Sequence, residues 1–141
     1  NVNFENTNQI VAGASMGGLM SIKTSILFPQ FRNIISLSPA FWFGYPRVLY
    51  DVKNLSNESS TYLYTGKKEG HIFGDHVKNI FSNDWDLDFS NNDDFYYSGV
   101  KKIQDSLKSN NKTVIFSYQE NGHHNETSWA TAILDILGKL I

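Results

Sequence analysis

The sequence predicts an α/β fold, with a mainly parallel sheet flanked by helices, in one domain spanning residues 1–141. Short apolar runs of strand length alternate with longer segments that have helical periodicity. This alternation is typical of βαβ units, whose strands pair in parallel. A length of 141 residues, with 40% hydrophobic and 18% charged side chains, is sufficient for one domain with a sizeable core.

The regular elements that we expect follow one another along the chain. They are a strand at 9–13, a helix at 17–28, strands at 33–37 and 61–65, a helix at 96–109, a strand at 113–118 and a helix at 126–141. Residues 51–60 are polar and are predicted to form a loop. Residues 70–95 are predicted to be mostly loop, with a short helix near 74–81.

The first strand and helix have the clearest signals. Residues 9–13 form an apolar run that ends in glycine, which is typical of a buried strand. In the helix that follows, Leu19, Ile22 and Ile26 share one face. Pro29 ends the helix because proline lacks an amide donor and clashes with the preceding turn.

The later elements rest on composition and spacing. Residues 33–37 (NIISL) form a second buried run, and residues 61–65 and 113–118 are rich in aromatic and β-branched side chains. Residues 96–109 have an amphipathic spacing. The last helix is expected to bury Trp129, Ile133, Ile136, Leu137 and Leu140.

The first candidate functional residue lies between the first strand and the first helix. Gly13 to Gly17 match G-x-S-x-G, and this strand–turn–helix setting favours a nucleophile elbow at Ser15. We expect side chains at Gly13 and Gly17 to collide with neighbouring backbone. The N–H of Met16, at the helix N-terminus, can point toward an oxyanion. The alternative is a tight turn that contains a serine without a catalytic role.

A serine nucleophile needs a base, and the chain has four histidines. His71 and His76 lie in the irregular segment and are predicted to be solvated loop residues. His123 and His124 follow the strand at 113–118, and catalytic residues gather at the carboxyl ends of parallel strands. The spacing alone leaves both open as the base.

The acid that orients the base is expected between the serine and the histidine. Glu69 lies just past the strand at 61–65 and meets this condition. The alternative is a solvated turn carboxylate beside Lys67 and Lys68. Glu120 also follows a strand but lies too close to the histidines in sequence to face them easily.

An acidic stretch matches a calcium-binding loop in part. The rest of its pattern argues against a metal site. Asp84, Asp86 and Asp88 match the first half of a calcium-binding loop. Phe89 stands where that loop has glycine, and Phe95 stands where it has the bidentate glutamate. We therefore expect no metal ligands, and consider an aromatic and acidic loop over a cleft as the alternative.

Four stretches in this order resemble one family. They are IVAGASMGG, SPAFWF, YLYTGKKEG and NGHHNETSW. The combination is similar to the esterase family of α/β hydrolases that includes esterase D, enterochelin esterase-like hydrolases, feruloyl esterases and mycolyltransferases. The resemblance extends over most of the chain except residues 70–95, and it implies an α/β-hydrolase fold.

The resemblance also implies roles for individual residues. Ser15 matches the nucleophile and Glu69 the acid. His124 matches the histidine before Asn-Glu-x-x-Trp, which favours it over His123. Trp42 matches the aromatic residue that lines the substrate cleft. No metal or cofactor is implied.

The chain departs from this family before the elbow strand, where the family has several further strands. Only residues 1–8 precede that strand here. In the fold, a loop after an early strand supplies the second oxyanion donor. We therefore expect a C-terminal portion of a hydrolase, whose sheet is completed by an N-terminal half or by a second chain.

The expected function is hydrolysis of a small-molecule carboxylic ester through a Ser-His-Glu triad and an acyl-enzyme. The alternatives are an acyltransferase with the same triad, or a non-catalytic fragment that binds a partner through its sheet edge.

Composition limits the other partners. A net charge of −2 without basic runs argues against nucleic acid, and no apolar run approaches the roughly 20 residues of a membrane span. The lack of cysteine leaves the redox compartment open. With no signal-peptide pattern, we expect a cytoplasmic location.

Overall fold

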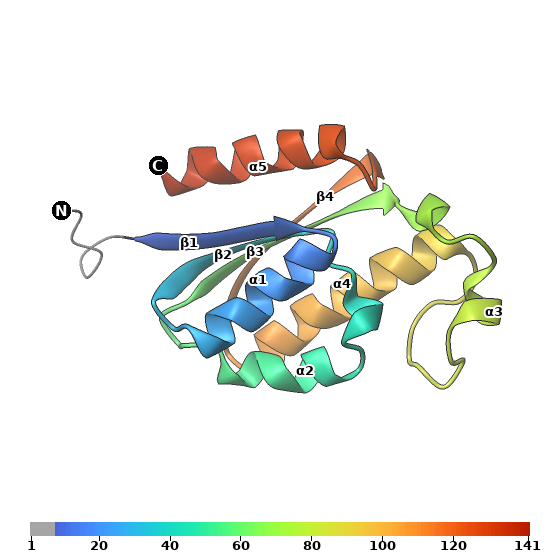
Figure 1. The fold of residues 1–141 in the computed structure, drawn as a ribbon, viewed down its shortest axis with the longest axis horizontal. Helices are drawn as coiled ribbons and strands as arrows, with labels where there is room; N and C mark the ends of the chain where they lie inside the picture. The colour runs from blue at the N-terminus through green and yellow to red at the C-terminus, as the bar shows by residue number, and fades with distance from the viewer. Residues whose placement is uncertain (1–7) are drawn as a thin grey trace.

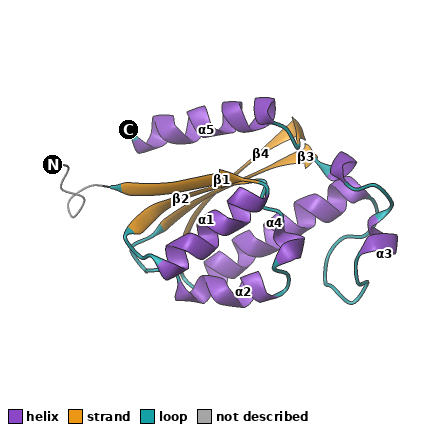
Figure 2. Cartoon of the chain, viewed as in Figure 1, coloured by secondary structure: helices purple, strands orange, loops and turns teal. Residues whose placement is uncertain are grey.

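The computed structural model describes residues 8–141 and has an α/β architecture built on one parallel sheet (Figure 2). The four strands pair in the order of the sequence, and every pair is parallel. They are β1 (Gln9–Ala14), β2 (Phe31–Leu37), β3 (Ser60–Lys68) and β4 (Thr113–His123). The predicted parallel sheet flanked by helices is confirmed.

The helices cover the two faces of the sheet unequally (Figure 1). α1 (Met16–Leu27), α2 (Arg47–Asp51) and α4 (Asn92–Ser109) lie on one face, and α5 (Glu126–Leu140) crosses the other. The short α3 (Val77–Ile80) lies beyond the end of the sheet. None of the helices in residues 8–141 has both the length and the apolar character needed to span a bilayer.

The larger core lies between the sheet and the three helices on its first face. Its side chains alternate along each strand with those of the second face, because successive residues point to opposite sides. Fully buried members include Ile22, Ile34, Val48, Leu63, Val100 and Ile103. Met20 and Leu27 of α1 are exposed, so the buried face of that helix is narrower than its apolar content indicates.

A smaller core lies under α5. Ile35, Leu37 and Tyr64 of the sheet are buried there against Ala132 and Ile136. The expectation that α5 buries five large side chains is correct only for Ile136. Trp129, Ile133, Leu137 and Leu140 are half-buried because α5 has no neighbouring helix on this face of the described chain.

Several elements extend beyond their predicted bounds. α4 begins at Asn92 instead of residue 96, and its N-cap is Asn91, whose side chain accepts the Asp94 N–H at 2.8 Å. The polar first turn conceals this start from a search for apolar periodicity. β4 continues to His123, so Glu120 and His123 lie in the strand and not in a loop after it.

The predicted loop at 51–60 overlaps a helical segment. Asp51 ends α2, and the 3-10 turn Val52–Asn54 follows it. Asp51 forms an ion pair with Lys23 of α1, and the hydrogen bond from Lys23 lowers the pKa of Asp51. This tertiary contact ties α2 to α1, and the local sequence does not reveal it.

The segment at 73–91 packs on the larger core through its aromatic side chains. Phe81 stacks on Phe95 with ring centroids 5.0 Å apart, and Trp85 contacts Tyr45 at 4.9 Å. Asp86 forms an ion pair with Lys102 at 2.5 Å. Residues 84, 86 and 88 belong to no metal-binding group among the described residues.

Candidate active site

Ser15 lies at the sharp turn between β1 and α1. Its φ of 57° and ψ of −120° are outside the regions that side-chain-bearing residues normally adopt. Such a conformation costs about 1–3 kcal/mol and persists only where the surroundings enforce it. Here the Ser15 N–H donates to Leu37 O and the Ser15 carbonyl accepts from Ala40 N, both at 2.9 Å. The end of β2 thus holds the strained turn in place.

Glycines allow this turn to pack, although not all of those we expected. A Cβ at Gly13 would lie 2.2 Å from the carbonyl oxygen of Gly17, and a Cβ at Gly18 would lie 2.7 Å from Leu37 O. A Cβ at Gly17 would meet no atom within 4 Å, so the predicted collision there is wrong. It is the backbone of Gly17, and not its side-chain position, that approaches β1.

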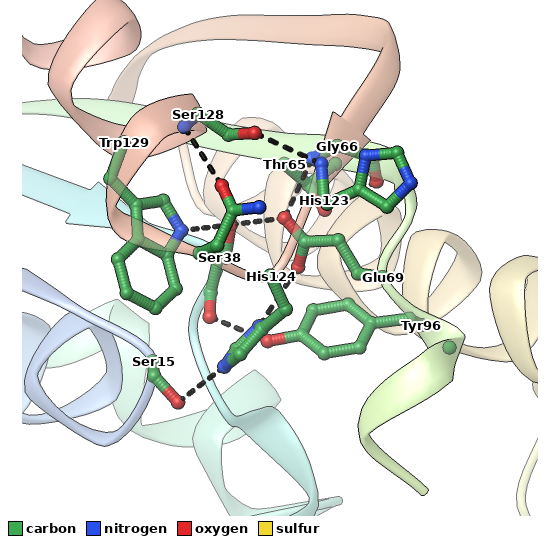
Figure 3. A network of polar contacts seen from close by, with 12 residues as sticks. Ser15, Ser38, Thr65, Gly66, Glu69, Tyr96, His123, His124, Ser128 and Trp129 are labelled. Carbon is green, nitrogen blue, oxygen red and sulfur yellow. Dashed lines mark hydrogen bonds and ion pairs between the residues drawn. The ribbon is translucent and has the colours of Figure 1, made fainter.

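Ser15 and His124 are in hydrogen-bond contact, although 109 residues separate them in sequence (Figure 3). Ser15 Oγ lies 2.9 Å from His124 Nε2. Both residues directly follow strands of a parallel sheet, and the carboxyl ends of such strands meet at one edge. The distance is within the range expected of a nucleophile and its base.

Glu69 completes the line of polar contacts. Its Oε2 lies 3.3 Å from His124 Nδ1, and the residue is fully buried just past the end of β3. Its Oε1 accepts hydrogen bonds from Ser38 Oγ at 2.5 Å and from the Gly66 N–H at 2.9 Å. A buried carboxylate needs such donors to replace water. The alternative of a solvated turn carboxylate is therefore wrong.

Glu120, by contrast, is a carboxylate that faces solvent. It pairs with Lys67 at 3.0 Å on the surface of β3 and β4. The Lys67 ammonium also lies over the Tyr118 ring, 4.5 Å from its centroid.

Ser38 connects the acid to the aromatic wall of the site, and the sequence analysis did not identify it. Its hydroxyl donates to Glu69 and accepts from Trp129 Nε1 at 3.0 Å. Its carbonyl accepts from the Tyr96 hydroxyl at 2.6 Å. Ser38 is fully buried with a φ of 44°. The usable signal was a Ser-Pro step at the carboxyl end of a predicted strand.

Two aromatic rings enclose the His124 imidazole (Figure 3). The ring centroids of Trp129 and His124 are 4.9 Å apart in an edge-on arrangement, and those of Tyr96 and His124 are 5.5 Å apart. Burial, together with the charge of Glu69, raises the pKa of Tyr96 well above its ordinary value. Tyr96 is therefore a neutral hydrogen-bond donor at any physiological pH.

The backbone around His124 explains why this histidine, and not His123, faces the serine. His123 N–H donates to Ser128 Oγ at 3.0 Å, and Asn125 N–H donates to the His123 carbonyl at 2.9 Å. The His123 side chain instead contacts the Asn121 carbonyl through Nδ1 at 2.8 Å. The two neighbouring side chains thus diverge at the end of β4.

The remaining histidines have different environments. His76 is the N-cap of α3, where its Nδ1 accepts the Lys78 N–H at 3.1 Å. His71 is exposed, as expected, but its Nε2 accepts the His124 N–H at 3.1 Å. No pattern in the sequence predicts this contact, which joins two segments that carry members of the site.

Met16 and Trp42 lie outside the line of side-chain contacts that joins Ser15, His124 and Glu69. Met16 is the first residue of α1, where N–H groups have no intrahelical acceptor, so its amide remains a candidate oxyanion donor. Trp42 lies in the 3-10 turn Phe41–Phe43, half-buried against Tyr96 with centroids 5.3 Å apart. Trp42 reaches His124 only through Tyr96 in these contacts, and its role as a substrate contact stays a prediction.

Comparison of the chain with protein-family models, with curated proteins and with solved structures finds no match. The functional assignment therefore depends on the geometry of the site. Ser15, His124 and Glu69 form a continuous line of contacts, and an arrangement of this kind can transfer a proton from a serine hydroxyl to an imidazole.

Proposed function

We propose that the protein is a serine hydrolase. The observation that carries this proposal is the continuous contact from Ser15 Oγ to His124 Nε2 at 2.9 Å and from His124 Nδ1 to Glu69 at 3.3 Å. A serine hydroxyl is a poor nucleophile unless an adjacent base removes its proton. A buried carboxylate on the far nitrogen keeps the imidazole in the tautomer that can do so.

Within this class, we propose that the substrate is a small carboxylic ester. Ser15 Oγ attacks the ester carbonyl while His124 Nε2 takes its proton, and the Met16 N–H stabilises the oxyanion. The ester C–O bond then breaks, and His124 returns the proton to the departing alcohol. Water, deprotonated by His124, hydrolyses the acyl-enzyme and releases the acid. The residues require no cofactor for these steps.

The resemblance to the esterase family of α/β hydrolases supports the same proposal, and with it the finer fold class. In that fold the elbow strand is central. Here β1 has a strand neighbour on one side only among the described residues, and Ile10 is 40% exposed. We propose that a further segment, from this chain or a second one, pairs with β1 and supplies the second oxyanion donor.

Covalent labelling tests the nucleophile. A fluorophosphonate probe is expected to label the protein at Ser15, and Ser15→Ala is expected to abolish both the label and the hydrolysis of p-nitrophenyl acetate. Ser109→Ala, at an exposed position on the last turn of α4, is the matched control and should leave both unchanged. Labelling that survives in the Ser15→Ala variant would refute the assignment.

Hydrolysis and acyl transfer share the acyl-enzyme, so product analysis separates them. We expect free acid as the main product when an alcohol acceptor is added in excess. A transferred ester as the main product would identify an acyltransferase instead.

A further inference from the structure

The imidazole of His71 joins the two segments that carry the acid and the base. His71 lies in the 3-10 turn Gly70–Ile72, which begins immediately after Glu69. Its Nε2 is 3.1 Å from the backbone nitrogen of His124. A backbone N–H can only donate, so His71 Nε2 must be the acceptor and must carry no proton. The contact therefore requires the neutral ring with its proton on Nδ1.

This bond differs from those of the neighbouring amides. The N–H groups of His123 and Asn125 are bonded within their own segment, to Ser128 and to His123. The His124 N–H instead crosses to the turn after β3. His71 thus sets the position of the His124 backbone relative to Glu69, and Glu69 binds the same residue through its side chain.

We propose that His71 is a positioning residue for His124 and makes the site sensitive to pH. This inference rests on the proposed function. A protonated His71 would present an N–H to the His124 N–H, so the hydrogen bond would be lost and the peptide of His124 released. The catalytic imidazole would then hold its alignment with Ser15 for a smaller fraction of the time.

The surroundings of His71 include both signs of charge. The His123 ring lies 5.7 Å away, and Lys68 and Asp93 line the same surface hollow. Asp93 Oδ1 already accepts the Gly70 N–H at 2.7 Å. The charged and titratable side chains around His71 are therefore Lys68, Asp93 and His123.

Two substitutions distinguish the role of the hydrogen-bond acceptor from the role of the volume of the ring. His71→Gln places a carbonyl oxygen at the same number of bonds from the backbone as Nε2, and it cannot be protonated. His71→Leu removes the acceptor. Because one net hydrogen bond is at stake, we expect His71→Leu to lower kcat by roughly two- to ten-fold with little change in KM. His71→Gln should retain most of the activity.

The pH profile provides a readout that a purely structural role would not change. The ratio of wild-type to His71→Gln activity should fall as the pH is lowered, because protonation removes the acceptor at residue 71 in the wild type only. His123→Gln removes the adjacent imidazole without touching the bond and serves as the control. A ratio that is constant with pH, or equal activity in His71→Leu and wild type, would overturn the proposal.

A measurement independent of catalysis separates this inference from the proposed function. The amide proton shift of His124, followed by NMR, should respond to protonation of the His71 ring in the wild type and in Ser15→Ala. It should lose that response in His71→Gln. Absence of esterase activity in the wild type would refute the proposed function, whereas an unresponsive His124 amide would refute the role of His71.

Discussion

Each member of the candidate site is held by more than one neighbour. One carboxylate oxygen of Glu69 accepts hydrogen bonds from the Ser38 hydroxyl and the Gly66 N–H, and the second oxygen contacts His124. Ser15 is bonded through its N–H to Leu37 at the end of β2 and through its carbonyl to Ala40 just after it. Such support fixes the rotamers and the strained backbone of a site before substrate arrives.

Replacing the acid by its amide tests the role of the charge. In Glu69→Gln the amide oxygen can still accept from Ser38 and Gly66, but the amide nitrogen then faces His124 Nδ1. This geometry favours the tautomer whose Nε2 carries the proton, which cannot accept the proton of Ser15. We expect kcat to fall by up to about 10⁴-fold, the loss known for the equivalent change in a serine protease.

The control is Glu120→Gln, which removes an equal charge from the exposed pair with Lys67. We expect it to change kcat by less than about two-fold, since exposed ion pairs contribute little. Stopped assays at saturating ester, with melting temperatures recorded for both variants, provide the comparison. Equal losses in the two variants would show that Glu69 does not act through His124.

Sequence patterns could identify residues of the site but not their connections. The elbow pattern and the strand-end rule pointed to Ser15 and Glu69, and the family resemblance separated His124 from His123. Ser38, Tyr96 and His71 were missed because their roles depend on side-chain and backbone contacts across strand ends. Neither periodicity nor composition carries that information.

At the scale of elements, the turn between β1 and α1 depends on specific backbone approaches. Gly13 and Gly18 lie against backbone atoms, whereas Gly17 faces open space in the first turn of α1.

The predicted bounds of β3 and β4 are too short because they depend on apolar residues alone. Their last residues are polar, and they are strand because they pair with each other, from Gly66 with Gln119 to Lys68 with His123.

The surroundings of the two glycines predict opposite effects of alanine at Gly17 and at Gly13 on the free energy of unfolding. Gly17→Ala should leave the free energy of unfolding unchanged or raise it by about 0.4–1 kcal/mol, because its φ is ordinary and the unfolded chain loses freedom. Gly13→Ala should lower it by about 1–3 kcal/mol or more, because the Cβ would overlap the Gly17 carbonyl.

Urea unfolding followed by circular dichroism measures both variants under one protocol. Gly138→Ala is a useful reference, since that glycine also has no atom within 4 Å of its Cβ position and lies in a helix. Equal free energies of unfolding for Gly13→Ala and Gly17→Ala would mean that the turn accommodates a side chain at residue 13 without loss of stability.

At the scale of the whole molecule, the two faces of the sheet are covered unequally. One face carries three helices and a large core, and the other carries α5 alone (Figure 1). An apolar groove lies between α5 and β1, lined by Ala12, Leu37, Trp129 and Ile133 among others. Among residues 8–141, β1 has a strand neighbour on one side only, and an edge strand next to such a groove tends to associate with other strands.

We therefore expect residues 1–141 alone to self-associate as concentration rises. Ile10→Lys should reduce this association, because a charged side chain on an edge strand disfavours pairing. Ile80→Lys is the matched control, since Ile80 is 46% exposed but lies on α3, beyond the end of the sheet. Sedimentation velocity across a dilution series measures the effect, and a monomer at every concentration would contradict it.

The hydrogen-bonded network around Glu69 takes one residue from the end of each strand. Ser15 follows β1, Ser38 follows β2, Glu69 follows β3 and His124 follows β4. A slip of one residue in any strand would turn its side chains to the other face of the sheet. The network can close only when all four registers are correct. The network therefore favours the correct register, because a misregistered sheet would leave the buried carboxylate of Glu69 without its hydrogen-bond donors.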